Sequence, residues 1–486
     1  MDSHRRHLHR GFNWLGGAAA IAKVIDMATL LAVLLFLSKQ QVGVASLVIS
    51  VGTIVESLDG LGSREALVQA PALSRAQLDT LFWFIAGAAL IVAALMLVAA
   101  PYLEALYGVA GMAVYFVAVA AKQPIVGAAV IPLAMMSRDL QYERIAVVNV
   151  SATLGAALTR LGLAVAGAGV WSLVGGYFAS GLYTLIAAQL ARPFWPRLHF
   201  RMGEIAPLVR FGVHAATSNF LDQWLRNVDY LLIGWFYGPA RLAVYRVAFA
   251  IGMEPALAVG TLINRTVLPV FVRASAVKGE LAQSLMWSLR RLALLIAPLA
   301  AATILAAGPI TALIHDAQGH SYAAAALPLE LLAGAALLRV TSQLLYPLVM
   351  GSGRPEIAAR LSLVTLLLLV AGFILVGMRF PARTGIAAAS AVWVALYPLL
   401  LVWEGRYLRR HWNIGARELA RAFRAPLIGA AVLACALAVV RLLARGADPG
   451  IQPGMQLGIV AVAAAITYAV LSLHARERRA ADDTQS

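Results

Sequence analysis

Runs of about 20 apolar residues recur along the whole chain and limit its possible folds more than any other feature. The 486-residue sequence is 61% hydrophobic and only 13% charged. A run of this length crosses the hydrocarbon core of a bilayer as a helix, because the bilayer offers no water to unpaired backbone groups. The runs lack the alternation of barrel strands, so the predicted fold class is an all-α polytopic membrane protein.

About fourteen membrane-spanning helices are expected, separated by short polar loops. The predicted spans lie near residues 14–37, 42–62, 80–100, 111–133, 145–168, 170–191, 207–235, 240–268, 287–307, 323–350, 356–378, 384–404, 424–444 and 454–473.

The net charge of +16 is explained by membrane topology, so no nucleic-acid partner is expected. If the basic N-terminus around residues 5–10 is cytoplasmic and the spans alternate, most other basic residues fall in inner loops. The predicted outer loops near 38–41, 101–110 and 308–322 carry almost none, although three arginines on later outer loops are exceptions. This pattern predicts an even number of spans and two cytoplasmic termini.

An internal repeat relates two parts of the chain at a constant offset of 200 residues. Phe36–Gly52 reads FLSKQQVGVASLVISVG, and Phe236–Gly252 reads FYGPARLAVYRVAFAIG. Both copies share the first Phe, a central Val and the last Gly. Two copies in the same order indicate two pseudo-symmetric lobes with a path between them, which is a common plan for transporters.

The repeat and the loop composition divide the chain into four parts. A six-helix N-lobe is expected over residues 1–191 and a six-helix C-lobe over 207–404. A cytoplasmic linker with two prolines and a basic cluster joins them over 192–206. Residues 405–486 are expected to add a C-terminal helix pair and a cytoplasmic tail.

Ionisable side chains inside predicted spans are the candidate functional residues. Each costs about 3 kcal/mol at mid-bilayer and therefore tends to face the bundle interior or a water-filled cavity. Asp222, Arg226 and Asp229 of the seventh span follow Asn219 and lie on one helical stripe. The stripe is interpreted as a group that holds an anionic substrate or relays a coupling cation. A helix-internal salt bridge is the alternative.

The first span places polar groups at matching positions. The repeat offset puts Asp26 opposite Arg226, and Lys23 lies one turn before Asp26. This correspondence predicts a central cavity shared by the two lobes, with a local Lys23–Asp26 pair as the alternative.

The second and eighth spans supply further candidates. Arg246 and Glu254 lie on the eighth span, and Glu56 lies toward the cytoplasmic end of the second, where a gate pair or a solvated helix end would fit. Three lone basic residues at middle depth have both functional and structural interpretations: Lys122, Arg160 and Arg339.

The sequence offers little for catalysis. It has no P-loop, and no His lies in an HExxH pattern. The single cysteine, Cys435, lies in an apolar run and cannot form an internal disulfide. We therefore expect no catalytic residue, no metal and no cofactor, and we do not expect an enzyme.

Several stretches resemble the polysaccharide transporter family of the multidrug/oligosaccharidyl-lipid/polysaccharide exporter superfamily. They are DGLGSREALVQ (59–69), MMSRDLQYERIA (135–146), GVWSLVGGYFAS (169–180) and LVRFGVHAATSNFLDQWLRNVDYLLIGWFYGPARLAVYRVAF (208–249). The last is similar to the family's seventh and eighth helices, where Arg-Asn-x-Asp is followed by an aliphatic run and Gly. In this chain those residues are Arg226, Asn227, Asp229 and Gly234.

The resemblance implies a flippase that moves undecaprenyl-diphosphate-linked oligosaccharides across the bacterial inner membrane by alternating access, for exopolysaccharide or O-antigen (lipopolysaccharide) biosynthesis. Membrane lipids, a polysaccharide polymerase and a chain-length regulator would be its partners. On this hypothesis the substrate would be bound by Arg226, Lys23, Arg246 and Asn219. Coupling or ion pairing would involve Asp26, Asp222, Asp229, Glu56 and Glu254.

Two alternatives stay open. A multidrug cation antiporter of the same superfamily would need an acidic cavity, whereas the mid-depth groups here have a small excess of bases. A membrane-embedded glycan polymerase or ligase would need a large periplasmic loop, and the longest predicted outer loop covers only 308–322.

Overall fold

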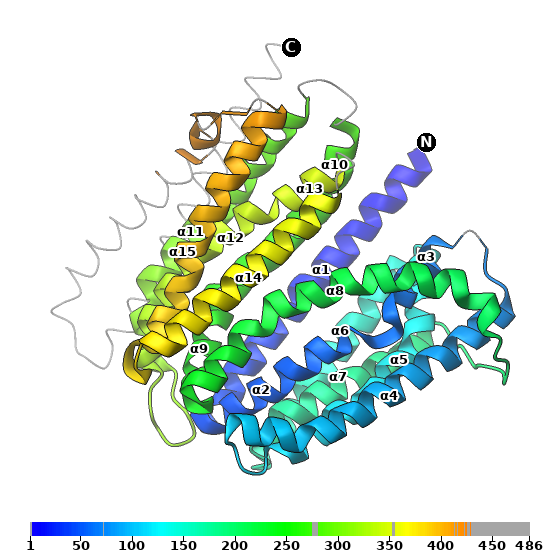
Figure 1. The fold of residues 1–486 in the computed structure, drawn as a ribbon, viewed down its shortest axis with the longest axis horizontal. Coiled ribbons are helices and arrows are strands. Elements are labelled where there is room, and N and C mark those ends of the chain that lie inside the picture. The colour runs from blue at the N-terminus through cyan, green and yellow to red at the C-terminus, as the bar shows by residue number, and fades with distance from the viewer. Residues whose placement is uncertain are drawn as a thin grey trace. The chain divides into compact units, whose positions relative to one another are not determined.

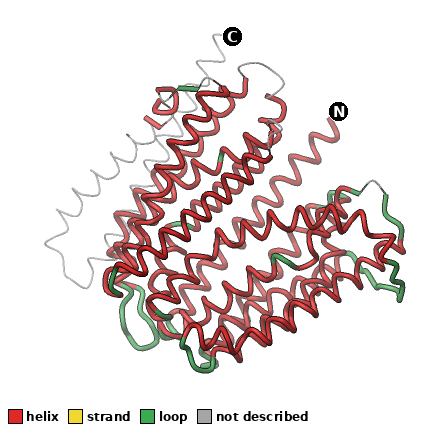
Figure 2. Tube along the Cα trace, in the orientation of Figure 1, coloured by secondary structure: helices red, strands yellow, loops and turns green. Residues whose placement is uncertain are grey.

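The computed structural model describes residues 2–70, 72–274, 280–351 and 355–412, with scattered positions between 414 and 428. Within these residues the regular structure is helical, apart from an isolated bridge between His315 and Ser321 (Figure 2). The predicted all-α class is confirmed for this part of the chain. Cys435 and the predicted spans 424–444 and 454–473 lie outside the described residues, apart from Arg424 and Ile428.

The first compact unit comprises Met1–Ala243 and Asp316–Gln318. Its helices, labelled in Figure 1, are α1 (Asp2–Leu34), α2 (Lys39–Glu56), α3 (Ser63–Gln69), α4 (Arg75–Tyr107), α5 (Phe116–Arg138), α6 (Tyr142–Val165), α7 (Val170–Ala191) and α8 (Met202–Tyr237). Helix α6 packs against both α1 and α7, and α8 packs against α2, α3 and α4.

The second unit comprises Val244–His315 and Gly319–Ser486. Helix α9 (Pro239–Gly252) begins in the first unit and continues into the second. The other described helices are α10 (Glu254–Ala274), α11 (Glu280–Leu313), α12 (Ala326–Gln343), α13 (Leu345–Gly351), α14 (Pro355–Arg379) and α15 (Ala382–Trp412). Helix α12 packs against α11 and α15, and α15 also packs against α14.

Many of these helices are long and apolar enough to cross a membrane. Among the described residues nine segments meet that criterion, or ten if α9 and α10 form one bent span. The bend is 45°, and Pro255 lies at the second position of α10 beside it. Helices α2 and α8 coincide with the second and seventh predicted spans but are not among the nine. They carry many of the polar residues of the site.

Two helices of the first unit begin with the same local signal. Ser38 and Gln41 form a capping box at the start of α2, and Ser74 and Gln77 form one at the start of α4. In each box the side chains bond reciprocally to backbone N–H groups that have no partner inside the helix. These polar residues therefore fix where two of the helices start.

Glycines allow the start of α9 and the end of α8 to approach α2. A Cβ atom at Gly43 would lie 1.8 Å from the carbonyl oxygen of Pro239, and one at Gly234 would lie 2.4 Å from Cδ2 of Leu47. The backbone contact excludes a side chain at Gly43, whereas a side chain at Gly234 would require Leu47 to shift. Gly43 belongs to the first copy of the internal repeat and Pro239 to the second, so the two copies meet near their starts.

Candidate functional site

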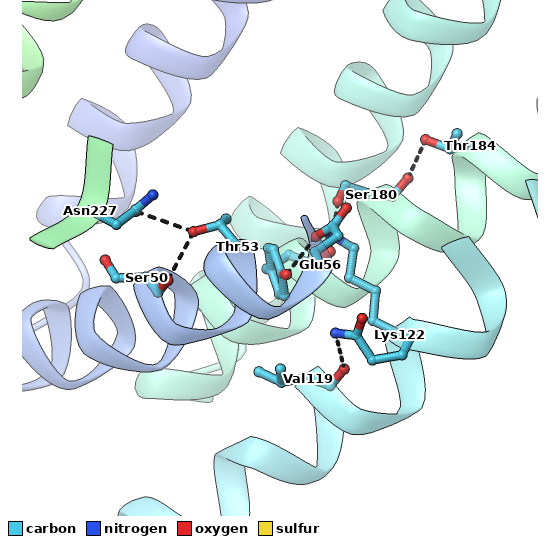
Figure 3. A network of polar contacts seen from close by, with 10 residues as sticks. Ser50, Thr53, Glu56, Val119, Lys122, Ser180, Thr184 and Asn227 are labelled. Atoms are coloured by element: carbon cyan, nitrogen blue, oxygen red, sulfur yellow. Dashed lines mark hydrogen bonds and ion pairs between the residues drawn. The ribbon is translucent and has the colours of Figure 1, made fainter. Parts of the chain in front are cut away.

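A charged network joins three helices inside the first unit (Figure 3). Nζ of Lys122, on α5, lies 2.8 Å from Oε2 of Glu56, the last residue of α2. The hydroxyl group of Tyr177, on α7, donates to the same oxygen at 2.6 Å. Nζ of Lys122 also lies 3.4 Å from the centroid of the Tyr177 ring. Because the Lys122 side chain is only 5% exposed, contacts such as these offset part of the cost of burying its charge.

Glycines make room for this network. A Cβ atom at Gly52 would lie 3.0 Å from the hydroxyl oxygen of Tyr177, and one at Gly181 would lie 3.0 Å from Cε of Lys122. Gly52 is also the residue that ends the first copy of the repeat. The small residues therefore let long polar side chains lie between the helices, where charge-assisted hydrogen bonds offset part of their desolvation.

A second ion pair joins α1 to α6. Nη1 of Arg160 lies 2.9 Å from Oδ1 of Asp26, and their side chains are 21% and 42% exposed. A Cβ atom at Gly176 would lie 2.0 Å from Cγ of Arg160, so α7 leaves space for the arginine. Lys23 lies on the same helix as Asp26 and is partly exposed. The interpretation of Arg160 and Lys122 as lone bases was wrong, because each has an acidic partner from another helix.

The predicted stripe on α8 contains residues in two different environments. Nε of Arg226 lies 2.7 Å from Oδ2 of Asp222, and the two side chains are 42% and 55% exposed. Asp229 is fully buried and accepts a hydrogen bond from the next backbone amide at 2.9 Å. Asn219 is exposed and donates to Oε1 of Glu65, on α3, at 3.2 Å. The structure thus joins two of the predicted residues in an accessible pair and places the third in the interior.

Asn227 ties α8 to α2. The hydroxyl group of Thr53 donates to Oδ1 of Asn227 at 3.1 Å (Figure 3). Nδ2 of Asn227 donates to the carbonyl oxygen of Gln223 at 2.9 Å. Sequence reasoning did not include Asn227, Thr53 or Tyr177 among the site residues. For Asn227 and Tyr177 the available signal was their place in the two stretches that carry the family resemblance.

The second unit holds the two predicted residues of the eighth span. Arg246 and Glu254 lie on either side of the bend between α9 and α10, and Nη1 of Arg246 is 3.8 Å from Oε1 of Glu254. Both side chains are partly buried. The bend therefore brings the two charges within ion-pair distance, although they are eight positions apart along the chain.

The charged side chains of the two units can bind a charged group of a ligand. The Asp222–Arg226 pair is the accessible one, whereas Glu56, Lys122 and Tyr177 fill the space between helices. In the part of the chain that the structure describes, no group of three or more His, Cys, Asp or Glu side chains is placed to hold a metal ion.

Residues 31–323 match the family described as "Polysaccharide biosynthesis protein". The chain is 22% identical over 280 residues to the lipopolysaccharide biosynthesis protein WzxC of Escherichia coli (strain K12), which covers 54% of each protein. It is 24% identical over 264 residues to the succinoglycan biosynthesis transport protein ExoT of Rhizobium meliloti (strain 1021), covering 54% of this chain and 53% of that protein. The aligned part therefore spans about half the length of these relatives.

The fold resembles those of solved membrane transporters. The lipid II flippase MurJ, in an inward closed conformation, matches with a TM-score of 0.73 at 12% identity, over 94% of this chain and 98% of that one. A multidrug resistance MATE family transporter of the MOP superfamily, in an inward-facing conformation, matches with a TM-score of 0.63 at 14% identity, over 81% and 95%. At these identities the likeness concerns the fold alone. Together with the apolar helices, it indicates a multi-pass membrane protein.

Proposed function

Because this chain belongs to the polysaccharide biosynthesis protein family, we propose that it is a flippase for lipid-linked oligosaccharides. It carries undecaprenyl-diphosphate-linked repeat units from the cytoplasmic to the periplasmic side of the bacterial inner membrane, for exopolysaccharide or O-antigen biosynthesis. Support comes from relatives named for lipopolysaccharide biosynthesis and succinoglycan transport, and from a fold similar to that of a lipid II flippase.

The accessible Asp222–Arg226 pair on α8 is the observation that carries the proposal. An exposed ion pair contributes only about 0–1 kcal/mol, so Arg226 can exchange its partner at little cost. A guanidinium group binds phosphate oxygens in a bidentate manner, which favours exchange of Asp222 for a diphosphate. Lys23, Arg246 and Asn219 are proposed to bind other parts of the same head group.

The acidic residues are proposed to control these bases. Asp222 returns to Arg226 when the passenger leaves, whereas Asp26, Glu56 and Glu254 hold basic partners from other helices or helix segments. Asp229 is proposed to take part in coupling to an ion gradient from its buried position. A polysaccharide polymerase and a chain-length regulator are proposed as partners, because the released units must be assembled into polymer.

We propose alternating access between an N-lobe (1–191) and a C-lobe (207–404), joined by the 192–206 linker and followed by a helix pair in 405–486. The internal repeat supports two lobes, the apolar runs support fourteen spans in total, and the distribution of basic loops supports cytoplasmic termini. Helix α8 begins the proposed C-lobe, yet it packs on α2, α3 and α4 of the first unit. On this proposal those contacts break and form again during each cycle.

The proposal is tested in a strain that lacks the gene and carries wild-type or variant copies. The Arg226→Gln variant should reduce surface polysaccharide by about tenfold or more, since one charge-assisted contact contributes about 1.5–3 kcal/mol. Sugar-loaded lipid carrier should accumulate on the cytoplasmic side. Arg201→Gln is the matched control, because the Arg201 side chain is 74% exposed and lies outside the proposed site.

Two other outcomes would replace the proposal. Single units exposed on the periplasmic side, without polymer, would identify a polymerase. Unchanged polysaccharide in the deletion strain would remove the flippase function and favour the multidrug antiporter, for which the fold likeness to MATE transporters is the specific observation. A drug-sensitivity screen of the deletion strain would then test that function.

A further inference from the structure

Arg339, on α12, carries a buried positive charge that no residue in the described part of the chain neutralises. The residue is 5% exposed, and its Nη1 atom has no hydrogen-bond partner there. The two other bases first interpreted as lone, Lys122 and Arg160, both have carboxylate partners at under 3 Å. Arg339 therefore differs from Lys122 and Arg160, because no carboxylate of the described residues pairs with it.

The guanidinium group of Arg339 lies against a cluster of aromatic rings. Its Cζ atom is 4.5 Å from the centroid of Trp393, on α15, and Nε1 of Trp393 donates to the hydroxyl group of Tyr245, on α9, at 2.8 Å. Tyr397 stacks on Trp393 with ring centroids 6.0 Å apart. We call this set of rings the aromatic floor; it consists of Trp393, Tyr245, Phe249, Phe373 and Tyr397.

The aromatic floor offsets only part of the free-energy cost of burying the charge of Arg339. The negative face of an aromatic ring attracts a guanidinium group, but this attraction is smaller than the cost of removing the charge from water. Lys122 shows the complete arrangement, because it has both a ring, Tyr177, and a carboxylate, Glu56. Arg339 has the ring alone, so an oxyanion at its N–H groups would complete the same arrangement.

A buried acid on a helix that packs against α12 is engaged elsewhere. Glu404, on α15, is 4% exposed, and its Oε1 atom accepts a hydrogen bond from Ser342 at 2.5 Å. It lines a cavity whose other walls are mainly leucine. Ser342 lies one turn after Arg339 on α12, so α12 and α15 contain a base and an acid that do not form an ion pair.

We propose that Arg339 and the aromatic floor form an oxyanion-binding site in the second unit, which takes a phosphate group or a sugar carboxylate of the passenger. This inference rests on the proposed function for the source of the anion. The floor is contributed by α9, α14 and α15, and Trp393 is fully buried. The passenger must therefore reach Arg339 in a conformation in which these helices have separated from α12.

Direct binding tests the site without any transport assay. Geranyl diphosphate, geraniol and glucuronate are titrated calorimetrically into the purified full-length chain in detergent. An Arg226→Gln background removes the accessible arginine from the measurement. In that background diphosphate should bind about tenfold or more tighter than geraniol, and Arg339→Gln should reduce this difference severalfold, because Lys23 and Arg246 are still present. Arg339→Lys should keep part of it.

A control variant and a second ligand, glucuronate, make the outcome of this titration specific. Arg379→Gln, at the exposed last turn of α14, should bind as its parent does. If the site takes sugar carboxylates, Arg339→Gln will weaken glucuronate instead of diphosphate. Equal affinities for all three compounds before and after Arg339→Gln would overturn the inference. Deletion of the gene tests export separately, so loss of the proposed function and loss of this site are distinguishable.

Thermal stability gives an independent test, which also covers a variant that folds poorly. Removing an uncompensated buried charge should raise the apparent Tm, so Arg339→Leu is expected to gain about 2 °C or more. Lys122→Leu should lower the Tm, because it leaves Glu56 without its base. If Arg339→Leu lowers the Tm as much as Lys122→Leu does, Arg339 is a structural residue and the site is refuted.

Discussion

At the scale of single residues, burial decides what an ion pair contributes. The Glu56–Lys122 pair joins two helices, Tyr177 adds a third, and Lys122 is buried, whereas Asp222–Arg226 lies within one helix and is exposed. Removing one member of a buried pair leaves the other charge without compensation. Removing one member of an exposed pair that faces a water-filled cavity leaves a charge that water can solvate.

Glu56→Gln should therefore destabilise the fold by about 3–5 kcal/mol, because the buried Lys122 would lose the carboxylate that lies 2.8 Å from its Nζ atom. The measurement is the apparent Tm in detergent. Adding Lys122→Met to Glu56→Gln should recover part of the loss, because the double variant lacks both charges of this pair. The matched control is Asp222→Asn, whose effect should stay within about 0.5 kcal/mol. A Glu56→Gln protein as stable as wild type would show that this network does not hold the helices.

Asp222→Asn and Arg226→Gln should have opposite effects on the proposed passenger. The first removes the carboxylate that competes for Arg226, so geranyl diphosphate should bind more tightly, by about fivefold at most. The second removes the base itself and should weaken binding. Titration calorimetry measures both. Equal changes in the same direction would indicate that Arg226 does not contact the diphosphate.

The residues that pair between different helices could not be identified from the sequence alone. Asp26 and Arg160 are 134 positions apart, and Glu56 and Lys122 are 66 apart, so their proximity depends on helix packing. Spacing along one helix correctly joined Asp222 to Arg226. It also placed Asp229 on the same stripe, but it could not reveal that this position is buried. The helical repeat predicts which residues share one face of a helix, but it does not predict which other helices cover that face.

At the scale of helices, apolar runs predicted position well. Each of the first twelve expected spans coincides with a described helix or with a consecutive pair of helices. The expected second span, 42–62, was partly wrong, because α2 ends at Glu56 and is followed by a 3-10 turn at Asp59–Gly62. Gly60 and Gly62 both have positive φ values there, a conformation that ends a helix.

The contact between α2 and the start of α9 predicts a sensitive glycine. Gly43→Ala would place a methyl group 1.8 Å from the carbonyl oxygen of Pro239, and a backbone atom has little freedom to move away. The expected cost is about 1–3 kcal/mol or more, measured as a fall in Tm. Gly87→Ala, on α4, is the control; its Cβ atom would meet nothing within 4 Å, so it should be neutral or stabilise by about 0.5–1 kcal/mol. Equal Tm values for the two variants would contradict this packing.

At the scale of the whole molecule, the question is whether α8 moves against α2. The two compact units divide between Ala243 and Val244, after α8, whereas the sequence predicts a lobe boundary at residues 192–206. Contacts in one conformation define the units, and a repeat in the sequence defines the lobes. The lobe boundary stays a prediction, which a cross-link can test.

Cysteines at Thr53 and Asn227, in a Cys435→Ala background, should form a cross-link between α2 and α8 with a short thiol reagent. If α8 moves with the C-lobe, the cross-link should stop polysaccharide export. The control is a cross-link between cysteines at Leu163 and Gly175, which join α6 to α7 within the N-lobe and should leave export unchanged. Normal export with a complete α2–α8 cross-link would place α8 with the first unit throughout the cycle.

The exposure of the Asp222–Arg226 pair has a consequence for evolvability. On the proposed function, substitutions at these two positions change the charge offered to the passenger and leave the ion pairs that join different helices intact. Lineages that build different surface glycans can then alter cargo preference without first acquiring stabilising mutations elsewhere. The same property makes α8 the segment to randomise when such a transporter is adapted to a new glycan in an engineered bacterium.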